Sequence, residues 1–192
     1  ENSIRQIAEM YQLGSTKNRE IIFWQIDTTG KVRTGKIMQY NKETGKRIHH
    51  QSGAINWVHN LLKRQGKINQ DFNLAQCFFG EHLLKQYPDK SVAIVEGEKT
   101  AIIASIVFPD YLWLATGTLN GLTLDKCLVL NNRTVFIFPD LGKAYDVWKQ
   151  KTREISKFIK WNVQVSELLE EIATEFAVTQ GYDIADYILE KQ

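Results

Sequence analysis

Two carboxylates follow short apolar runs, where they could support metal-dependent chemistry on phosphates. Glu96 comes directly after the run 91–95, and Asp140 follows the run 134–138 with one proline between. Short, continuously apolar runs are typical of strands that are buried on both faces of a parallel sheet. Because ligands of open parallel sheets bind beyond the carboxyl ends of the strands, we expect both side chains at one site. Two carboxylates there could share Mg²⁺ (or Mn²⁺), which takes oxygen ligands and acts on phosphate substrates.

A purely structural role is the alternative for each charged residue near these strand ends. An acidic side chain at a helix start complements the helix dipole, and for Glu96 alone this explanation is as good as a catalytic one. Glu98 could add a second metal-binding carboxylate from the same strand end, although an exposed helix carboxylate is more often simply solvated. Lys99 could offer its ammonium group to a phosphate or could equally be a solvated surface lysine.

The alternation of strands and helices after residue 90 predicts the framework that carries these residues. We expect four strands (91–95, 111–115, 134–138 and 162–165) and three helices (100–107, 143–158 and 168–177). Such alternation is typical of βαβ units, which build a mostly parallel sheet flanked by helices. The predicted fold class is therefore α/β, and we assign this sheet to a domain over residues 89–192.

The preceding residues, 1–88, are predicted to form a smaller α+β subdomain. Its expected elements are an amphipathic helix, an antiparallel meander, a polar excursion with one or two helical turns, and a second helix (3–11, 20–40, 41–70 and 73–86, respectively). The meander is indicated by runs of β-branched and aromatic residues between turn signals. Gly14 is expected to close the first helix, whereas Gly80 counts against the second.

Composition and charge limit the classes of protein to which this chain can belong. Hydrophobic residues make up 43% of the 192 residues, which is ample for the core of a globular protein. The net charge of +2 does not by itself indicate a nucleic-acid partner. The two cysteines lie far apart and suggest neither a zinc site nor a disulfide framework. No apolar run reaches the roughly 20 residues that span a membrane, and no signal peptide opens the chain, so we expect a cytoplasmic protein with no membrane partner.

The first strand of the parallel sheet carries a motif that resembles Toprim domains, which occur in bacterial primases, topoisomerases and certain nucleases. Residues 92–101 are similar to the hydrophobic strand and Glu-Gly pair of that family, and 138–140 to the strand that delivers the first aspartate of its Asp-x-Asp motif. Residues 114–118 are similar to the family's small-residue turn, and 72–80 to a motif that precedes the Glu-Gly strand in the core of bacterial-type DNA primases. The resemblance is closest to uncharacterised Toprim-like proteins of bacterial mobile elements.

The resemblance implies a role for each carboxylate. Glu96 would be the catalytic residue that moves a proton, and Asp140 would be the main metal ligand. The Asp-x-Asp motif would require an acidic residue at position 142, where this chain has Gly142. Asp146, one helical turn further on, could replace it as a metal ligand, and Glu98 could contribute from the other strand end. Both are also ordinary candidates for solvated surface charges.

The C-terminal stretch 181–187 resembles an Asp-containing segment of some primase-helicase Toprim proteins. Asp183 and Asp186 could approach the metal site from this segment, although aspartate at a helix start is also an ordinary cap. The substitution at position 142 leaves catalysis itself an open question at this point.

Basic residues cluster in the first part of the chain. The candidates for phosphate or nucleic-acid contact there are Lys31, Arg33, Lys36, Lys46 and Arg47. A local excess of positive charge can follow a phosphate backbone, and Trp24, Tyr40 and Trp57 could either stack on unpaired bases or lie in the core. His49 and His50 have no partner at metal-ligand spacing and are expected in an exposed loop.

Three functions are compatible with these residues. The first is a primase-like nucleotidyltransferase in replication of a mobile element, with nucleoside triphosphates, a single-stranded DNA template and a replicative helicase as partners. The second is a degenerate, non-catalytic Toprim module that binds nucleic acid or a replication partner. The third is a metal-dependent Toprim nuclease that uses the same carboxylates for hydrolysis. Because the chain begins with Glu1 rather than Met, we expect it to be a fragment of a longer protein.

Overall fold

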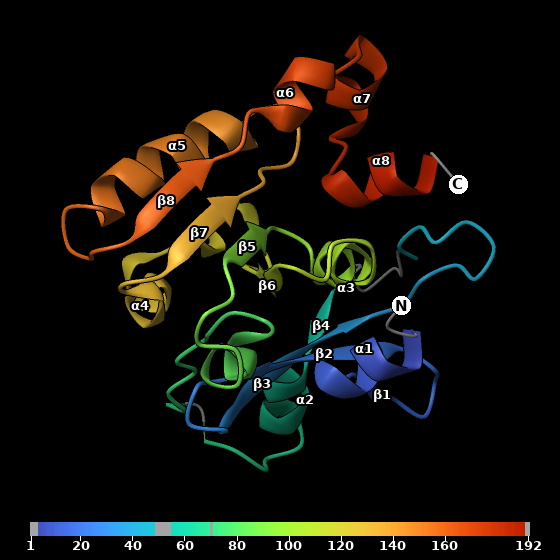
Figure 1. The fold of residues 1–192 in the computed structure, drawn as a ribbon. Helices are drawn as coiled ribbons and strands as arrows, with labels where there is room; N and C mark the ends of the chain where they lie inside the picture. The colour runs from blue at the N-terminus through green and yellow to red at the C-terminus, as the bar shows by residue number, and fades with distance from the viewer. Residues whose placement is uncertain (1–3, 49–54, 70, 191–192) are drawn as a thin grey trace.

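Two four-stranded sheets build the molecule, one antiparallel and one parallel (Figure 1). The computed structural model describes residues 4–48, 55–69 and 71–190. Helix α3 (Glu98–Val107) lies between the two halves, where it packs against α1 (Ile4–Met10) on one side and α8 (Ile184–Glu190) on the other. The first and last helices of the described residues therefore pack against the same central helix.

The antiparallel sheet has the order β1-β2-β3-β4. Its strands are Gly14–Ser15, Ile21–Ile26, Val32–Met38 and Asn56–Trp57. Strands β2 and β3 form the predicted meander, paired from Ile21 with Met38 to Ile26 with Val32. The β-branched and aromatic residues of β2 suit a pleated surface of which one face is buried, and Phe23 and Ile26 point into the core.

The parallel sheet has the order β6-β5-β7-β8, and all neighbouring strands run in the same direction. Its strands are β5 (Val92–Val95), β6 (Leu112–Ala115), β7 (Thr134–Ile137) and β8 (Asn162–Val165). All four residues of β5 are almost completely buried, as expected for a central strand covered on both faces. The α/β class, the parallel sheet and the smaller antiparallel meander before it are confirmed.

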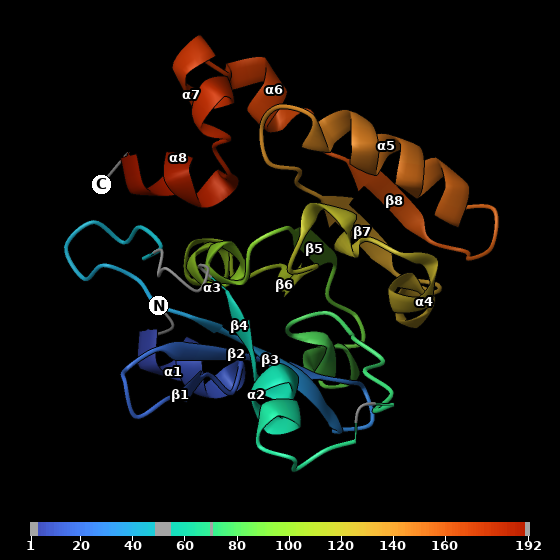
Figure 2. The same cartoon turned by 180° about the vertical axis from the view of Figure 1, so that it is seen from behind.

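Helices and short connections complete the fold (Figures 1 and 2). The other helical elements are α2 (Val58–Arg64), α4 (Leu124–Cys127), α5 (Ala144–Ile155), α6 (Leu168–Ile172), α7 (Glu175–Gln180) and the 3-10 helices Glu81–Lys85, Leu119–Gly121 and Leu128–Leu130. The described part of the β3–β4 connection, residues 39–48, runs near α3, as both views show. This brings the basic loop 41–48 close to the carboxyl end of the parallel sheet.

No helix in the described ranges is both long enough and apolar enough to cross a membrane.

The helix predicted over 73–86 is wrong for most of its length. Only Glu81–Lys85 is helical, as a 3-10 helix, and residues 73–78 before it have no regular secondary structure. Gly80 has a φ of +83°, which a helix interior does not allow, and Phe79 exchanges two backbone hydrogen bonds with Ala115, at 3.0 and 3.2 Å. The apolar side chains of this segment are buried because it runs along the edge of the parallel sheet.

Two helix boundaries also differ from prediction. The single helix expected over 168–177 is two helices, because Ala173 is extended and the Thr174 side chain accepts a hydrogen bond from the Ala177 N–H to start α7. Helix α1 is closed by Gln12, with a φ of +53°, while Gly14 already pairs in β1. His49 and His50 lie outside the described residues.

One apolar core joins the two sheets. Ile7, Tyr11 and Phe23 from the first part of the chain belong to the same buried cluster as the residues of β5 and β6. Tyr11 anchors this contact, because its hydroxyl hydrogen-bonds Ser105 of α3 and donates to the carbonyl of Trp113 in β6, both at 2.8 Å. The relative position of the two sheets is thus set by a packed interface.

Alanine at position 80 is expected to lower the free energy of unfolding more than alanine at position 30. Both glycines have a φ near +84°, which costs an L-residue roughly 1–2 kcal/mol. A Cβ at Gly80 would also lie 2.9 Å from Tyr11 and 3.0 Å from the Trp113 carbonyl, whereas one at Gly30 would meet nothing within 4 Å. Overpacking should add about 1–3 kcal/mol for Gly80→Ala alone. Equal losses in chemical denaturation would contradict this close packing.

Candidate active site

Five acidic residues line a pocket of about 420 Å³ at the carboxyl end of the parallel sheet, and four of them have no ion-pair partner among the described residues. Glu96 directly follows β5, and Asp140 follows β7, the neighbouring parallel strand. Asp183 and Asp186 reach the same pocket from the start of α8. The sequence left these last two residues open between a site and a helix cap. The structure brings them together with the two strand-end residues.

A backbone hydrogen bond holds the start of α8 against the end of β7. The Leu141 N–H donates to the carbonyl of Tyr182 at 2.8 Å. Asp183 caps α8, since its Oδ1 accepts hydrogen bonds from the backbone N–H groups of Ala185 and Asp186 at 2.8 and 3.1 Å. Its other oxygen, Oδ2, accepts a hydrogen bond from the Thr100 hydroxyl of α3. Capping and membership of the pocket are therefore compatible for Asp183.

The carboxylates of the pocket raise one another's proton affinity. Burial, together with the neighbouring Asp183, Glu96 and Asp186, raises the pKa of Asp140 to about 8. The Asp140 Oδ1 is buried and has no hydrogen-bond partner among the described residues. Burial also raises the pKa of Glu96 and of Asp183. Such a cluster is stable only with bound protons or with a cation.

The donors in this pocket fit a hard divalent cation. Carboxylate oxygens are the ligands that Mg²⁺ prefers, and the unpaired Oδ1 of Asp140 is a buried acceptor without a donor. As the side chains lie, however, no three acidic, histidine or cysteine residues in the described ranges are arranged to hold one metal ion. The pocket thus has the charge and the ligand type for a metal, but not a finished coordination sphere.

Glu98 is held in a buried ion pair rather than directed at the other carboxylates. The Lys36 ammonium lies 2.9 Å from its Oε2 and donates to the Gly117 carbonyl at 2.7 Å, and both charged side chains are almost fully buried. Gly117 in turn donates its N–H to the Glu96 carbonyl at 2.9 Å. Lys36 and Glu98 therefore join the antiparallel sheet to the ends of β5 and β6. Both side chains also line the acidic pocket, where they are committed to each other through Glu98 Oε2, while Glu98 Oε1 has no hydrogen-bond partner among the described residues.

Three other basic candidates do line the acidic pocket. Lys46 and Arg47 lie on its wall in the β3–β4 connection. Lys99 lies on its rim, with its ammonium 3.4 Å from the Gly45 carbonyl and 5.7 Å from the centre of the Tyr40 ring. Tyr40 also lines the pocket, so one of the aromatic residues considered for stacking lies beside the carboxylates.

The remaining candidates lie elsewhere. Lys31 is exposed in the β2–β3 turn, and Arg33 forms an ion pair with Asp27, at 2.6 Å, outside this pocket. Asp146 is exposed in the first turn of α5 and does not line the pocket. Trp24 and Trp57 are half-buried, and neither lines the acidic pocket.

Position 142 has a backbone conformation that favours glycine. The φ of Gly142 is +96°, and nothing lies within 4 Å of a Cβ built there. An aspartate at this position would be strained by its backbone rather than by lack of space. The turn that follows Asp140 thus suits glycine, and the additional carboxylates come from α8, more than 40 residues later in the chain.

Comparisons with known proteins agree on a fold and leave the chemistry open. The model of the family described as "Domain of unknown function (DUF6371)" matches residues 1–141. No curated protein sequence matches the chain. The chain is similar in structure to the primase fragment of the bacteriophage T7 primase-helicase protein, with 10% identity and a TM-score of 0.52 over 83% of this chain and 59% of that one.

Two further solved structures share this fold. The Aquifex aeolicus primase, with zinc-binding and RNA polymerase domains, is 15% identical with a TM-score of 0.53, over 97% of this chain and 48% of that one. A chain from the bacteriophage T7 lagging-strand DNA polymerase interacting with primase domains is 12% identical with a TM-score of 0.53, over 97% of this chain and 84% of that one. The chain thus spans about half to three fifths of the two primase fragments. At these identities the similarity establishes the fold alone.

Removal of the Lys36 charge is expected to destabilise the protein strongly. Lys36→Met would leave Glu98 buried without its partner, which typically costs about 3–5 kcal/mol of unfolding free energy. The double variant Lys36→Met, Glu98→Leu should regain a large part of this loss, because no unpaired charge remains. Chemical denaturation of the single and double variants measures both effects. A double variant no more stable than Lys36→Met would contradict a buried ion pair.

Without metal, the protein is expected to lose stability as the pH rises. The pKa of Asp140 is raised from 3.8 to about 8 in the folded state, so the folded state binds its proton more tightly than the unfolded state between these values. The free energy of unfolding should therefore fall progressively from about pH 4 to about pH 8. Asp140→Asn, which cannot ionise, should show a shallower fall. Identical slopes in denaturation at several pH values would show that this carboxyl is not perturbed.

Proposed function

The chain belongs to the family described as Domain of unknown function DUF6371, and we propose that it is a primase-like nucleic-acid-processing protein that catalyses metal-dependent nucleotidyl transfer. The observation that carries this proposal is the meeting of Glu96, Asp140, Asp183 and Asp186 in one pocket at the carboxyl end of a parallel sheet. Partly buried carboxylates that lie close enough to raise one another's pKa are typical of sites that bind hard cations and act on phosphates.

Asp140, Asp183 and Asp186 are the residues that would hold the divalent cation. Bound Mg²⁺ or Mn²⁺ would supply positive charge to the phosphate oxygens of a nucleoside triphosphate. Glu96 would act as general base, because burial raises its pKa toward the range in which a carboxylate accepts protons efficiently. Its carboxylate would take the proton of the attacking 3′-hydroxyl as the oxygen bonds the α-phosphorus and the bond to pyrophosphate breaks. The three aspartates and Glu96 would thus have two different parts in one reaction.

Basic side chains around the pocket would bind the phosphates of substrate and template. Lys46, Arg47 and Lys99 line the pocket beside the carboxylates, and none of them forms an ion pair with an acidic residue within the described ranges. Tyr40 offers an aromatic ring in the same wall, which suits an unpaired base of a single-stranded DNA template.

The structurally similar T7 primase domains support this choice of substrates. In that structure they are bound to an RNA/DNA hybrid and dTTP. A replicative helicase as partner and a role in replication of a mobile element belong to the same proposal. The name of the T7 primase-helicase protein is consistent with a helicase partner.

A non-catalytic nucleic-acid-binding module is the second candidate. It is favoured by the incomplete metal-ligand arrangement and by glycine at position 142, where the Toprim motif has an aspartate. In this case the basic residues of the pocket would bind nucleic acid and the carboxylates would not take part in turnover. A Toprim nuclease would use the same carboxylates, and its products would be shortened rather than extended strands.

Mg²⁺ binding and primer synthesis distinguish these functions. In isothermal titration, Asp140→Asn and Asp183→Asn should each weaken Mg²⁺ binding by about tenfold or more, since each removes a charged ligand. Asparagine at 183 retains the ability to cap α8, so the helix is preserved. Asp146→Asn is the matched control, because Asp146 is an exposed helix carboxylate outside the pocket, and it should bind Mg²⁺ like the wild type.

Extension of primers on single-stranded DNA should follow the same order among these variants, and Glu96→Gln should lose synthesis while it retains Mg²⁺ binding. Equal Mg²⁺ affinities for the wild type, Asp140→Asn, Asp183→Asn and Asp146→Asn would contradict the metal site. Metal binding with DNA binding but no extension or cleavage would favour the non-catalytic module.

A further inference from the structure

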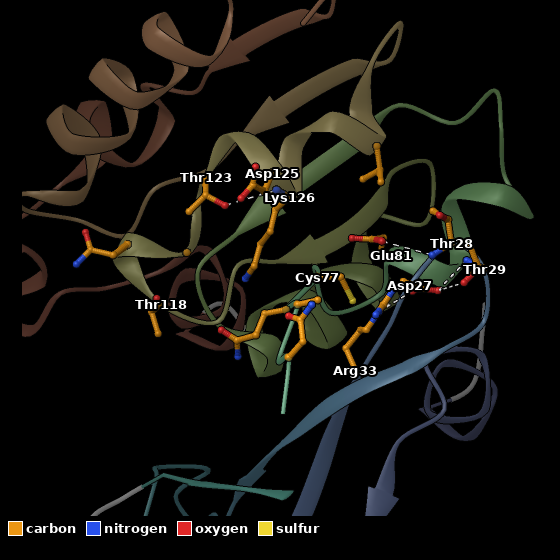
Figure 3. A pocket seen from close by; sticks show the side chains of 16 residues that line it. Asp27, Thr28, Thr29, Arg33, Cys77, Glu81, Thr118, Thr123, Asp125 and Lys126 are labelled. Carbon is orange, nitrogen blue, oxygen red and sulfur yellow. Dashed lines mark hydrogen bonds and ion pairs between the residues drawn. The ribbon is translucent and has the colours of Figure 1, made fainter. Parts of the chain in front are cut away.

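A second pocket, of about 720 Å³, lies between the antiparallel sheet and the end of β6 (Figure 3). We call it the polar pocket. Its walls are the β2–β3 turn with Arg33, the irregular segment 73–77, and residues 118–126, which include the 3-10 helix Leu119–Gly121 and the start of α4. It is large enough for a small organic ligand such as a nucleoside. The proposed nucleotidyl transfer does not use any of these side chains.

Lys126 is a buried ammonium group directed into the polar pocket. Only 8% of the residue is exposed, and in Figure 3 its side chain runs from α4 into the space between Thr118 and Cys77. Among the described residues, its ammonium group donates one hydrogen bond, to the Thr116 carbonyl at 3.0 Å. It also lies over the Phe78 ring, 5.9 Å from the ring centre. An ammonium group has three N–H donors, so donor capacity remains for an acceptor on a ligand.

The charges around Lys126 favour an uncharged ligand over a phosphate. The pocket is lined by three carboxylates and two cations. Asp27 accepts hydrogen bonds from the Thr29 N–H and hydroxyl and pairs with Arg33, while Glu81 accepts from the N–H groups of Thr28 and Phe78. These carboxylates are fixed in the wall and would repel an anion. A neutral ligand with hydrogen-bond acceptors would pair with Lys126 without that repulsion.

Three side-chain amides also line the pocket and supply both donors and acceptors. Asn73 and Gln76 lie in the irregular segment 73–77, and Asn120 lies in the 3-10 helix Leu119–Gly121. Within the described part of the chain, none of these three side-chain amides forms a hydrogen bond. Amide side chains match the edge of a nucleobase, because each presents a donor beside an acceptor.

We propose that the polar pocket binds a nucleobase, with the Lys126 ammonium and the side-chain amides of Asn73, Gln76 and Asn120 as its hydrogen-bonding partners. The choice of a nucleobase over other neutral heterocycles rests on the proposed function. Thr118 lines both the polar pocket and the acidic pocket, so a nucleotide seated here would have its phosphates at the border of the carboxylate cluster. The base could belong to a free nucleotide or to a nucleic-acid strand, and the chemistry of recognition is the same.

Nucleosides without phosphate are the probe for this pocket. Adenosine, guanosine, cytidine and thymidine would each be titrated into the metal-free protein and followed by calorimetry. For the nucleoside that binds best, Lys126→Met should raise the dissociation constant by about tenfold or more, because it removes a charge-assisted hydrogen bond and keeps the apolar stem. Asn120→Ala, on the exposed rim, should raise it several-fold. Lys157→Met is the control, since Lys157 is an exposed lysine at the end of α5 that lines neither pocket.

The two sources of the base are separated by competition. Displacement of the nucleoside by a nucleoside triphosphate would assign the pocket to a free nucleotide, and displacement by an oligonucleotide but not by the same strand with abasic sites would assign it to a template base. Both outcomes support a nucleobase pocket. Absence of nucleoside binding in the wild type would overturn the proposal. Wild-type affinity in both Lys126→Met and Asn120→Ala would overturn it as well, and the rim variant keeps this test valid if Lys126→Met does not fold.

Failure of this proposal is distinguishable from failure of the proposed function. Nucleoside binding is measured without metal and should be unchanged in Asp140→Asn. If Mg²⁺ binding and primer extension fail while nucleosides still bind through Lys126, the nucleotidyl transfer is wrong and the pocket stands. If extension depends on Asp140 but not on Lys126 and nucleosides do not bind, the pocket is wrong and the transfer stands.

Discussion

The buried pair of Lys36 and Glu98 is the interaction on which the geometry of both pockets depends. It connects β3 of the antiparallel sheet with the first turn of α3 and with the Gly117 carbonyl at the end of β6. A charge that stays buried without its partner is strongly destabilising, so a shift of one sheet against the other that parts Lys36 from Glu98 is disfavoured. The pair therefore makes the contact between the sheets specific, and the apolar core around Tyr11 supplies the surrounding packing.

Repulsion among carboxylates is the opposing constraint at the end of the parallel sheet. The fold brings Asp140 close to the two aspartates of α8, although burial and mutual repulsion disfavour charge there. The Leu141–Tyr182 hydrogen bond and the cap of α8 hold this arrangement in place. Strain concentrated at a few polar side chains, within a well-packed framework, is a common property of functional sites.

The sequence was most informative where one local pattern decides the structure. The strands of the parallel sheet are continuous apolar runs, and their order of strand and helix limits them to one class of fold. The helix over 73–86 is a wrong prediction because its apolar residues occur at helical spacing, whereas the chain is irregular there and pairs with the sheet edge at Phe79; Gly80 is the local sign of this. The C-terminal helix break was signalled by Thr174, a residue that caps α7.

The candidate site was predictable in its strand-end residues and not in the rest. Glu96 and Asp140 follow from the rule that parallel strands present their carboxyl ends to a ligand. Asp183 and Asp186 were visible as acidic residues, but their approach depends on a hydrogen bond between residues 41 positions apart. The burial of Lys36 could not be foreseen either, because lysine in a basic stretch is usually exposed and its partner Glu98 lies 62 residues away.

The backbone contact between Phe79 and Ala115 has a consequence for how copies of this chain meet. Strand β6 is one edge of the parallel sheet, and an open edge presents unpaired N–H and C=O groups that can recruit a strand from another molecule. At Ala115 those groups are already occupied by the chain itself. At its carboxyl end, this edge strand is therefore closed by the chain itself to pairing with a strand from another molecule.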